Sequence, residues 1–472
     1  MRKQIISVLA AAAMTAGLLT GCGGSGGTGG SGSAAGGGAD GTVQAGTTEG
    51  GRKSEGKIPL TMWFWSSNED QQATLQRVLI DKFNAAHPEY ELTVEYRGSV
   101  NKDMAVALAA NEGPDIVYES SPSLSMSYIQ AGKYADLSGY AETLGWKDRI
   151  IGPMYDSSTV DGKLYSIPMG LNVIGMVYNQ RVLDENGWSV PSTLDELTDI
   201  MDQAMEKGLY GSVTGAAGWR ETNEDYASLF INSFGGPSEV YKCLTGEQKW
   251  NTPAMLNAIE VSTEWYKKGY LCSDYTNFGW GEAASILGEG GAPFFFGPLK
   301  FVQNLSSYAV DEHKDDFGFT VFPAGRDGVA PTYTIGATGL LAINASSEHK
   351  DVCAEFLDMM LTNEFVSEIS VDWPGYWGVP LTTLNEIDAS KYEGLTRSFL
   401  NGISEACKAI DEGNFGYYCS SYLPPQTFEE FVAIDGVWFG EYSASDMLDK
   451  ADAVFDGELS SGLVPPVPAQ GK

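Results

Sequence analysis

The chain is poor in the residues that build metal centres and catalytic triads. Its 472 residues contain three histidines, His87, His313 and His349, which lie far apart in the sequence. His87 precedes a proline at the end of an apolar helical pattern, and the other two lie in charged segments that are typical of a protein surface. Neither a zinc site nor a Ser–His–Asp triad is expected from these residues. No metal, cofactor or catalytic residue is therefore predicted.

Basic residues are also scarce. The chain has 29 Lys plus Arg against 62 Asp plus Glu, which gives a formal net charge of −33. A surface of this sign repels nucleic acid and anionic lipid. Nucleic acid is therefore excluded as a partner.

The cysteines form no CxxC pair and no framework spacing. Apart from Cys22, they are Cys243, Cys272, Cys353, Cys407 and Cys419, an odd number. Two arrangements fit them: one or two bridges with at least one thiol left over, or five buried thiols. The second is favoured because a large core does not need the disulfides that stabilise small secreted domains.

The one long apolar run lies at the N-terminus. Arg2 and Lys3 precede apolar residues 5–19, which are too few to span a bilayer and are placed like a secretory signal over 1–21. The letters Leu-Thr-Gly-Cys, ending at Cys22, resemble a bacterial lipobox and imply lipid attachment at Cys22. The alternative is an ordinary signal peptide with a cysteine at its cleavage site. The lipobox predicts a lipoprotein on the extracellular face of the cell membrane.

A low-complexity segment follows, over residues 22–57. It consists almost entirely of Gly, Ser, Thr and Ala with no apolar periodicity, which predicts a flexible tether. The remaining chain is too long for one hydrophobic core, so two lobes are expected.

Strand and helix patterns alternate along this body. Residues 60–65 alternate like a strand, an apolar helical pattern then runs to His87, and residues 91–96 alternate again. Strand, helix and strand in this order predict a parallel sheet and an α/β fold. The other predicted elements are strands over 115–118, 163–168 and 173–178, helices over 102–110, 254–268, 347–361 and 429–442, and a helix opened by a Thr193–Glu196 capping box.

Five segments, in their order along the chain, carry a family resemblance. They are LTMWFWSSNED at 60–70, FNAAHPEYELTVEY at 83–96, ALAANEGPDIVYESS at 107–121, DGKLYSIPMGLNVIGMVYNQRVL at 161–183 and GVAPTYTIGATGLLAINASSEHKDVCAEFLDMMLTNE at 328–364. This ordered set, behind a lipobox, resembles the family 1 extracellular solute-binding proteins, the carbohydrate receptors of ABC importers.

The resemblance implies a two-lobe, periplasmic-binding-protein-like (type II) α/β fold with a hinge and an interlobe ligand cleft. Lobe one would hold 58–170 plus 328–364, and lobe two 175–325 plus 375–456, with a C-terminal tail over 457–472. One departure concerns the cleft, where the family often has a tryptophan and this chain has Leu299. Leucine cannot stack on a sugar, so Phe296 or Trp280 would have to supply that wall. The ligand is therefore expected to differ from the maltose that some receptors of this family bind.

A sugar site needs aromatic platforms for C–H faces and polar side chains for hydroxyls. In open α/β sheets such residues lie in loops after strands. The predicted ligand-binding residues are Trp65, Ser67, Glu69, Glu119, Ser120, Asn172, Trp219, Arg220, Tyr226, Phe296, Trp373, Trp377 and Phe431. Alternatives stay open: Trp65 also fits packing under a helix, Glu119 a helix N-terminal charge, and the aromatics at 373–377 a hydrophobic plug.

The expected function is a lipid-anchored, monomeric receptor that captures a carbohydrate, in particular an oligosaccharide, and delivers it to ABC transporter permease subunits. No chemistry on the ligand is expected. The alternatives are a membrane-tethered carbohydrate-active enzyme, for which two carboxylates would suffice, and the same fold with a non-sugar solute.

Overall fold

The computed structural model describes residues 56–470. The predicted signal sequence, Cys22 and nearly all of the tether lie outside these residues. The described part is an α/β structure around one mixed sheet, with strand order β2-β1-β3-β9-β6-β7, and with β8 paired to β6 and β10 paired to β9. The strands are β1 (Ile58–Trp65), β2 (Tyr90–Arg97), β3 (Ile116–Glu119), β6 (Ser166–Asn179), β7 (Phe294–Pro298), β8 (Phe317–Thr320), β9 (Tyr333–Ile343) and β10 (Phe415–Tyr417), with a separate pair β4 (Thr159–Val160) and β5 (Lys163–Leu164).

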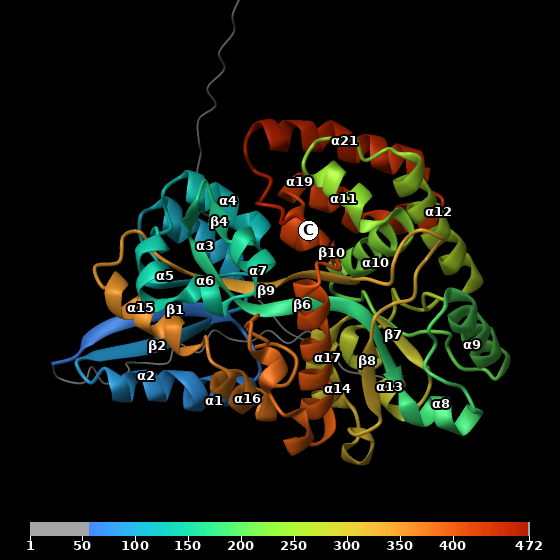
Figure 1. Ribbon diagram of the computed structural model, residues 1–472, viewed down its shortest axis with the longest axis horizontal. Helices are drawn as coiled ribbons and strands as arrows, with labels where there is room; N and C mark the ends of the chain where they lie inside the picture. Colours follow the sequence, from blue (N-terminus) through green and yellow to red (C-terminus); the bar gives the residue numbers. More distant parts are fainter. Residues whose placement is uncertain (1–55, 471–472) are drawn as a thin grey trace, which may run out of the picture. The chain divides into compact units, whose positions relative to one another are not determined.

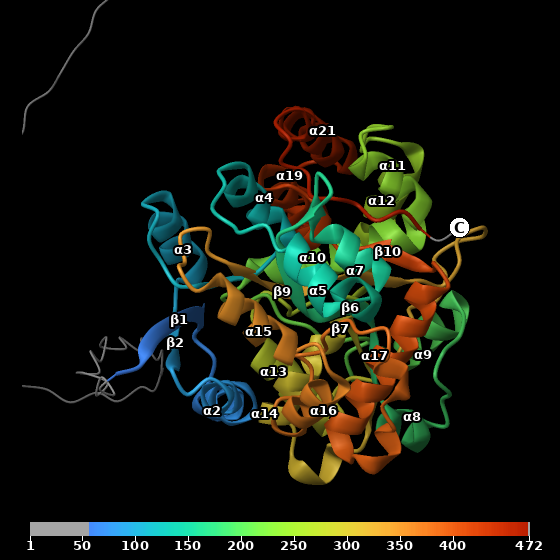
Figure 2. The same ribbon diagram turned by 60° about the vertical axis from the view of Figure 1, so that its left-hand side comes forward.

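Helices cover both faces of the β1, β2 and β3 part of the sheet, with α2 and α3 on opposite sides (Figure 1 and Figure 2). The α-helices are α1 (Glu69–Leu75), α2 (Asp81–Ala86), α3 (Val100–Ala109), α4 (Pro122–Gln130), α5 (Ser138–Leu144), α6 (Trp146–Arg149), α7 (Gly152–Ser157), α8 (Gln180–Asn186), α9 (Leu194–Glu206), α10 (Asn223–Phe230), α11 (Pro237–Leu244), α12 (Pro253–Lys268), α13 (Trp280–Glu289), α14 (Val302–Tyr308), α15 (Lys350–Met359), α16 (Asn363–Asp372), α17 (Gly394–Asp411), α18 (Cys419–Tyr422), α19 (Pro425–Val432), α20 (Ile434–Trp438) and α21 (Ala444–Ser460).

The predicted strand–helix–strand unit is confirmed. β1 pairs in parallel with both β2 and β3. The connecting helix is continuous through a π-helical turn, η1 (Gln76–Ile80), and its apolar positions, such as Leu75, Leu79 and Phe83, are fully buried. A helical repeat of apolar residues therefore places one face of this segment on the sheet.

Two long strands, β6 and β9, run side by side across the middle of the molecule (Figure 1). They pair antiparallel. The first part of β6 lies beside the part of β9 that pairs β3, and the last part of β6 pairs β7 and β8. Two groups of strands are thus joined through shared strands, and the described residues form one continuous body. The lobe boundaries remain predictions.

The two extended segments predicted at 163–168 and 173–178 are largely one strand, β6. Its register with β9 is irregular between Pro168 and Leu171, so the ladder bends there. A side chain at Gly170 would collide with Thr338 and with the carbonyl of Tyr376. A glycine at this position therefore lets the strand pass close to both neighbours.

The helix predictions have mixed outcomes. The helix over 254–268 is confirmed by α12, and the Thr193–Glu196 capping box opens α9 as expected. A single helix over 429–442 is wrong, because α19 and α20 are separated at Ala433, whose carbonyl accepts a hydrogen bond from the Tyr442 hydroxyl.

The five cysteines of the described residues are buried and unbridged. Within residues 56–470, no helix combines the length and the apolar character that crossing a bilayer requires.

We predict that Gly170→Ala destabilises the protein. The added methyl group would force β6 away from β9 and the loop of Tyr376, and overpacking of this kind costs about 1–3 kcal/mol. Gly457→Ala is the matched control, since Gly457 lies exposed in α21 with open space beside its Cα, and alanine there should add up to about 1 kcal/mol of stability. Urea unfolding of both variants measures the difference. Equal effects would contradict this role of Gly170.

Candidate functional site

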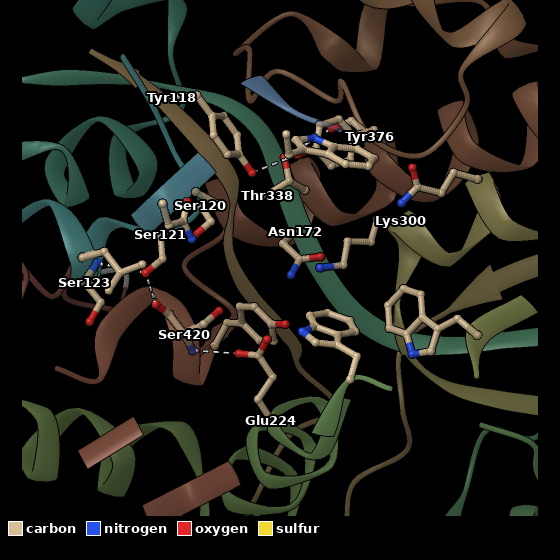
Figure 3. A pocket seen from close by; sticks show the side chains of 18 of the residues that line it. Tyr118, Ser120, Ser121, Ser123, Asn172, Glu224, Lys300, Thr338, Tyr376 and Ser420 are labelled. Atoms are coloured by element: carbon tan, nitrogen blue, oxygen red, sulfur yellow. Dashed lines mark hydrogen bonds between the residues drawn. The ribbon is translucent and has the colours of Figure 1, made fainter. Parts of the chain in front are cut away.

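A cavity of about 840 Å³ opens at the carboxyl ends of β1, β3 and β7 (Figure 3). It has lining residues from both groups of strands and from the crossing strands β6 and β9. On the side of β1 and β3 they include Trp65, Asn68, Gln71, Asn101, Tyr118, Ser120, Ser121 and Ser123, and on the side of β7 they include Trp219, Glu224, Trp280, Lys300, Gln303, Asn304, Phe428 and Glu429. The location follows the rule that open α/β sheets bind ligands beyond the carboxyl ends of their strands.

One wall of the cavity is aromatic and rigid. Trp65 and Tyr376 have ring centroids 5.4 Å apart, and the hydroxyls of Tyr118 and Tyr376 lie 3.2 Å apart. Behind Tyr376, the Trp373 ring stacks on it at 5.2 Å with an interplanar angle of 9°. This packing holds the ring faces in fixed orientations, as a stacking platform requires.

A second aromatic wall comes from Trp219 and Trp280. Their ring centroids are 5.4 Å apart at 70°, and the Trp280 indole donates a hydrogen bond to Thr222 Oγ1 at 3.1 Å. Trp280 is one of the two residues expected to take the place of the missing family tryptophan. The other, Phe296, is buried in β7, and Leu299 is also buried outside the lining.

Asn172 is a polar residue of the lining whose side chain makes no hydrogen bond within the described part of the protein. It lies on β6 with 1% exposure, and neither its Oδ1 nor its Nδ2 has a hydrogen-bond partner among the described residues. A buried amide without partners costs about 1–3 kcal/mol for each group left unsatisfied. Because Asn172 faces the cavity, a molecule in the cavity can supply both missing partners.

Serines at the start of α4 form another part of the lining. Ser121 caps the helix by accepting from the Ser123 amide at 3.1 Å, and both hydroxyls donate to backbone carbonyls, of Ser420 and Leu423 respectively. Ser120 accepts from Asn101 Nδ2 at 2.8 Å. The bonds of Ser121 and Ser123 fix α4 against α18, and the bond of Ser120 links the end of β3 to α3.

Two buried carboxyl groups stand at the start of α10. Glu224 accepts from the Ser420 amide at 3.1 Å, and Asp225 accepts from the Tyr418 hydroxyl at 3.0 Å. Burial raises the pKa of Asp225 to about 8, with a further increase from the charge of Glu224, while Lys300 opposes the shift. Burial likewise raises the pKa of Glu224. Glu224 lines the cavity and Asp225 stands behind it.

Of the predicted site residues, Trp65, Ser120, Asn172 and Trp219 line the cavity. The others, which the lining does not include, are Ser67, Glu69, Glu119, Arg220, Tyr226, Phe296, Trp373, Trp377 and Phe431. Contact with a ligand stays a prediction for all of them.

Several of these residues have protein partners that explain their positions. Arg220 forms a two-point ion pair with Asp435, with nitrogen–oxygen distances of 2.5 and 3.1 Å. Trp377 stacks on Phe64 at 5.7 Å. Glu119 is buried behind Ser120, whose amide donates to it at 2.8 Å, and burial raises its pKa to about 8.

Tyr226 and Phe431 pack in the core. Tyr226 has its ring centroid 5.8 Å from that of Trp438, and Phe431 has its centroid 4.9 Å from that of Trp250. The local sequence around Tyr226 and Phe431 does not show whether these rings pack in the core or line the cavity.

Sequence reasoning missed one face of α14. Lys300, just before this helix, is followed by lining residues at helical spacing, namely Gln303, Asn304, Ser307 and Tyr308. Polar residues at i, i+3, i+4, i+7 and i+8 directly after a buried strand predict a helix with one polar face, and this pattern could have identified the residues.

Within residues 56–470, no group of three or more His, Cys, Asp and Glu side chains is arranged to hold a metal ion.

The family model for bacterial extracellular solute-binding proteins matches residues 65–366. The chain belongs to this family. Among curated relatives of this solute-binding protein, it is 24% identical over 423 residues to the sn-glycerol-3-phosphate-binding periplasmic protein UgpB of Yersinia enterocolitica, covering 82% of this chain and 90% of the relative.

Solved structures support the same fold. A protein from work on xylan utilization by a thermophilic bacterium, Caldanaerobius polysaccharolyticus, has a TM-score of 0.72 at 22% identity, covering 84% of this chain and all of that one. A chitin oligosaccharide binding protein has a TM-score of 0.70 at 21% identity, covering 85% of this chain and all of that one. The predicted two-lobe, type II solute-binding fold is confirmed.

We predict that Asp225→Asn reduces the pH dependence of stability. Between about pH 4 and pH 8 the unfolded chain has lost the Asp225 proton and the folded protein keeps it, so stability falls as pH rises, by at most about 1.4 kcal/mol per pH unit for this proton. Asparagine keeps an acceptor for Tyr418 and removes the titration. Urea unfolding across this range should give a shallower slope than in the wild type.

The control is Asp199→Asn, which removes one carboxylate from the exposed face of α9 and changes the formal charge of the sequence by the same amount. A slope in Asp225→Asn as steep as in this control would contradict the assignment.

Proposed function

We propose that this solute-binding protein captures a carbohydrate, in particular an oligosaccharide, and delivers it to the permease subunits of an ABC importer. The observation that carries the proposal is a cavity that combines two aromatic walls with the unpartnered side-chain amide of Asn172. The structural neighbours, one from work on xylan utilization and one a chitin oligosaccharide binding protein, support the same class of ligand.

The chemistry of the lining favours a sugar. Aromatic faces stack on the C–H faces of a pyranose ring, and amide side chains donate to and accept from its hydroxyls. Besides Asn172, the lining offers amides at Asn68, Gln71, Asn101 and Gln303. The cavity of about 840 Å³ lies in the upper part of the range of roughly 300–1,000 Å³ for pockets that enclose a drug-sized ligand. A solute as small as glycerol phosphate would leave most of it to water.

The two lobes would close on the ligand about the crossing strands β6 and β9. Residues from both groups of strands line the cavity, so a bound ligand gains contacts with both only when the lobes are close. The permease would then distinguish the loaded receptor from the empty one by its shape.

Binding without reaction fits the family, whose members are solute-binding proteins. A carbohydrate-active enzyme needs two carboxyl groups that flank a glycosidic bond. The cavity offers Glu224 and Glu429, and Glu224 already accepts from the Ser420 amide. We propose that these carboxyl groups form hydrogen bonds with the ligand or with neighbouring residues and do not cleave a glycosidic bond.

We also propose that the receptor is a monomer held at the extracellular face of the membrane by a lipid on Cys22. Two acyl chains on one cysteine anchor a protein stably where one would not. The Gly-rich segment after Cys22 would let the receptor move while it remains near the permease.

We predict that an oligosaccharide from a screen by calorimetry binds the protein, quenches tryptophan fluorescence and reduces the radius of gyration. Trp219→Ala should weaken this binding by about tenfold or more, because it removes a stacking surface at the cavity. Trp188→Phe is the control, since Trp188 lies outside the lining and bonds to Gln203. Recovery of the sugar unchanged after long incubation excludes hydrolysis. No binding, or a cleaved sugar, would contradict the receptor function.

We predict that Cys22→Ala releases the protein from the membrane. Without a thiol there is no site for the diacylglyceryl group, so the variant should leave the detergent phase and appear in the culture medium. Cys243→Ala is the control, because Cys243 is buried in the folded body. Retention of Cys22→Ala in the membrane fraction would contradict the lipid anchor.

A further inference from the structure

Lys300 is the only basic side chain among the described residues that line the cavity. It lies in a 3₁₀ turn, η4 (Leu299–Phe301), directly after β7. Its two neighbours are buried, and Phe301 stacks on Phe295 at 3.7 Å. The backbone at Lys300 is therefore fixed from both sides.

The loop that carries Trp373 and Tyr376 also contacts this turn. Gly375 has φ of +105°, and a Cβ there would lie 3.0 Å from both the Lys300 carbonyl and the Gln303 amide. The loop of Trp373 and Tyr376 thus packs against the backbone at Lys300 and leaves its side chain to the cavity. A lysine whose backbone is fixed in this way can direct its side chain to a specific group of a ligand.

The Lys300 ammonium group lies over aromatic rings and not beside a carboxylate. Its Nζ is 5.6 Å from the Trp219 ring centroid and 5.7 Å from that of Trp280. No carboxylate of the described residues comes within ion-pair distance of it, whereas Arg149 and Arg181 each pair directly with an aspartate. The charge of Lys300 is therefore only partly compensated by the protein.

The nearby acidic groups have other hydrogen-bond donors. Glu224 accepts from the Ser420 amide, Asp225 accepts from the Tyr418 hydroxyl, and burial raises the pKa of both. A raised pKa favours the neutral form of each carboxyl group, so the pair neutralises the Lys300 ammonium group less than two exposed carboxylates would. The other carboxylate of the lining besides Glu224 is Glu429, which is exposed.

Resting on the proposed receptor function, we propose that the saccharide carries an anionic group, a carboxylate or a phosphate, and that Lys300 binds it. The ammonium group supplies the charge. Asn172, which points toward the same part of the cavity in Figure 3, supplies an amide donor, and Gln303 lies one turn further along α14. An ammonium group with neighbouring neutral donors binds a carboxylate or phosphate more tightly than a hydroxyl.

The test compares matched pairs of probes. The pairs are trigalacturonate with galactotriose, glucuronoxylotriose with xylotriose, and glucose 6-phosphate with glucose, so that carboxylate and phosphate are separate arms. Dissociation constants come from calorimetry on the full protein. For at least one pair, the anionic member should bind about tenfold or more tightly than its neutral counterpart.

Substitutions then assign the preference to Lys300. Lys300→Met should bring the two members of that pair to within about threefold, because the anionic member loses more affinity than the neutral one, and Lys300→Arg should keep the preference. Lys102→Met, which removes an exposed lysine of α3 outside the lining, controls for net charge. Thermal unfolding checks that each variant is folded.

Three results would overturn the inference. Neutral members that bind as tightly as the anionic ones contradict it and leave the receptor function intact. A preference that survives in Lys300→Met contradicts the role of Lys300. Binding of no saccharide at all contradicts the receptor function, and the present inference with it.

Discussion

The antiparallel pairing of β6 with β9 is the interaction on which the rest of the structure depends. Each strand takes part in both groups of strands, so the same ladder organises both sides of the cavity. Its irregular register near Gly170 occurs where Thr338 and Tyr376 come closest. Because Asn172 lies just beyond this irregularity, the backbone feature that joins the two halves also aims an unpartnered amide into the cavity. Connection and recognition therefore share a few residues of one strand.

Aromatic packing extends this arrangement. The rings of Phe64, Trp65, Tyr376 and Trp377 contact one another beside the crossing strands. The two interpretations of these aromatics, cavity wall and hydrophobic plug, are compatible, because Trp65 and Tyr376 face the cavity while the fully buried Trp377 supports them from behind. A wall backed by a stacked core loses little conformational entropy when a ligand binds, which favours affinity.

Local patterns predicted most of the elements and fewer of the site residues. Alternation and apolar spacing located β1, β2 and α12, because an element that is buried on one face has apolar residues at regular intervals in its sequence. Position after a strand correctly placed Trp65 near the cavity. Arg220 is a predicted site residue because it lies beside a tryptophan in a segment expected to form a cleft loop. Its partner Asp435 is 215 residues away, and no local pattern relates the two. Such distant pairings decide whether a polar side chain is available to a ligand, and they arise only with the tertiary fold.

Electrostatics distinguishes this cavity from the surface around it. The chain as a whole is strongly acidic, with a formal net charge of −33, and long-range repulsion alone would disfavour an anionic ligand. Charges separated by more than about 8–10 Å are screened at physiological salt, whereas a contact inside a cavity is screened much less. A single lysine beside Trp219 and Trp280, with neighbouring carboxyl groups shifted toward their neutral forms, can therefore dominate the local potential. The sign of the whole chain and the sign of the binding site need not agree, because they act over different distances.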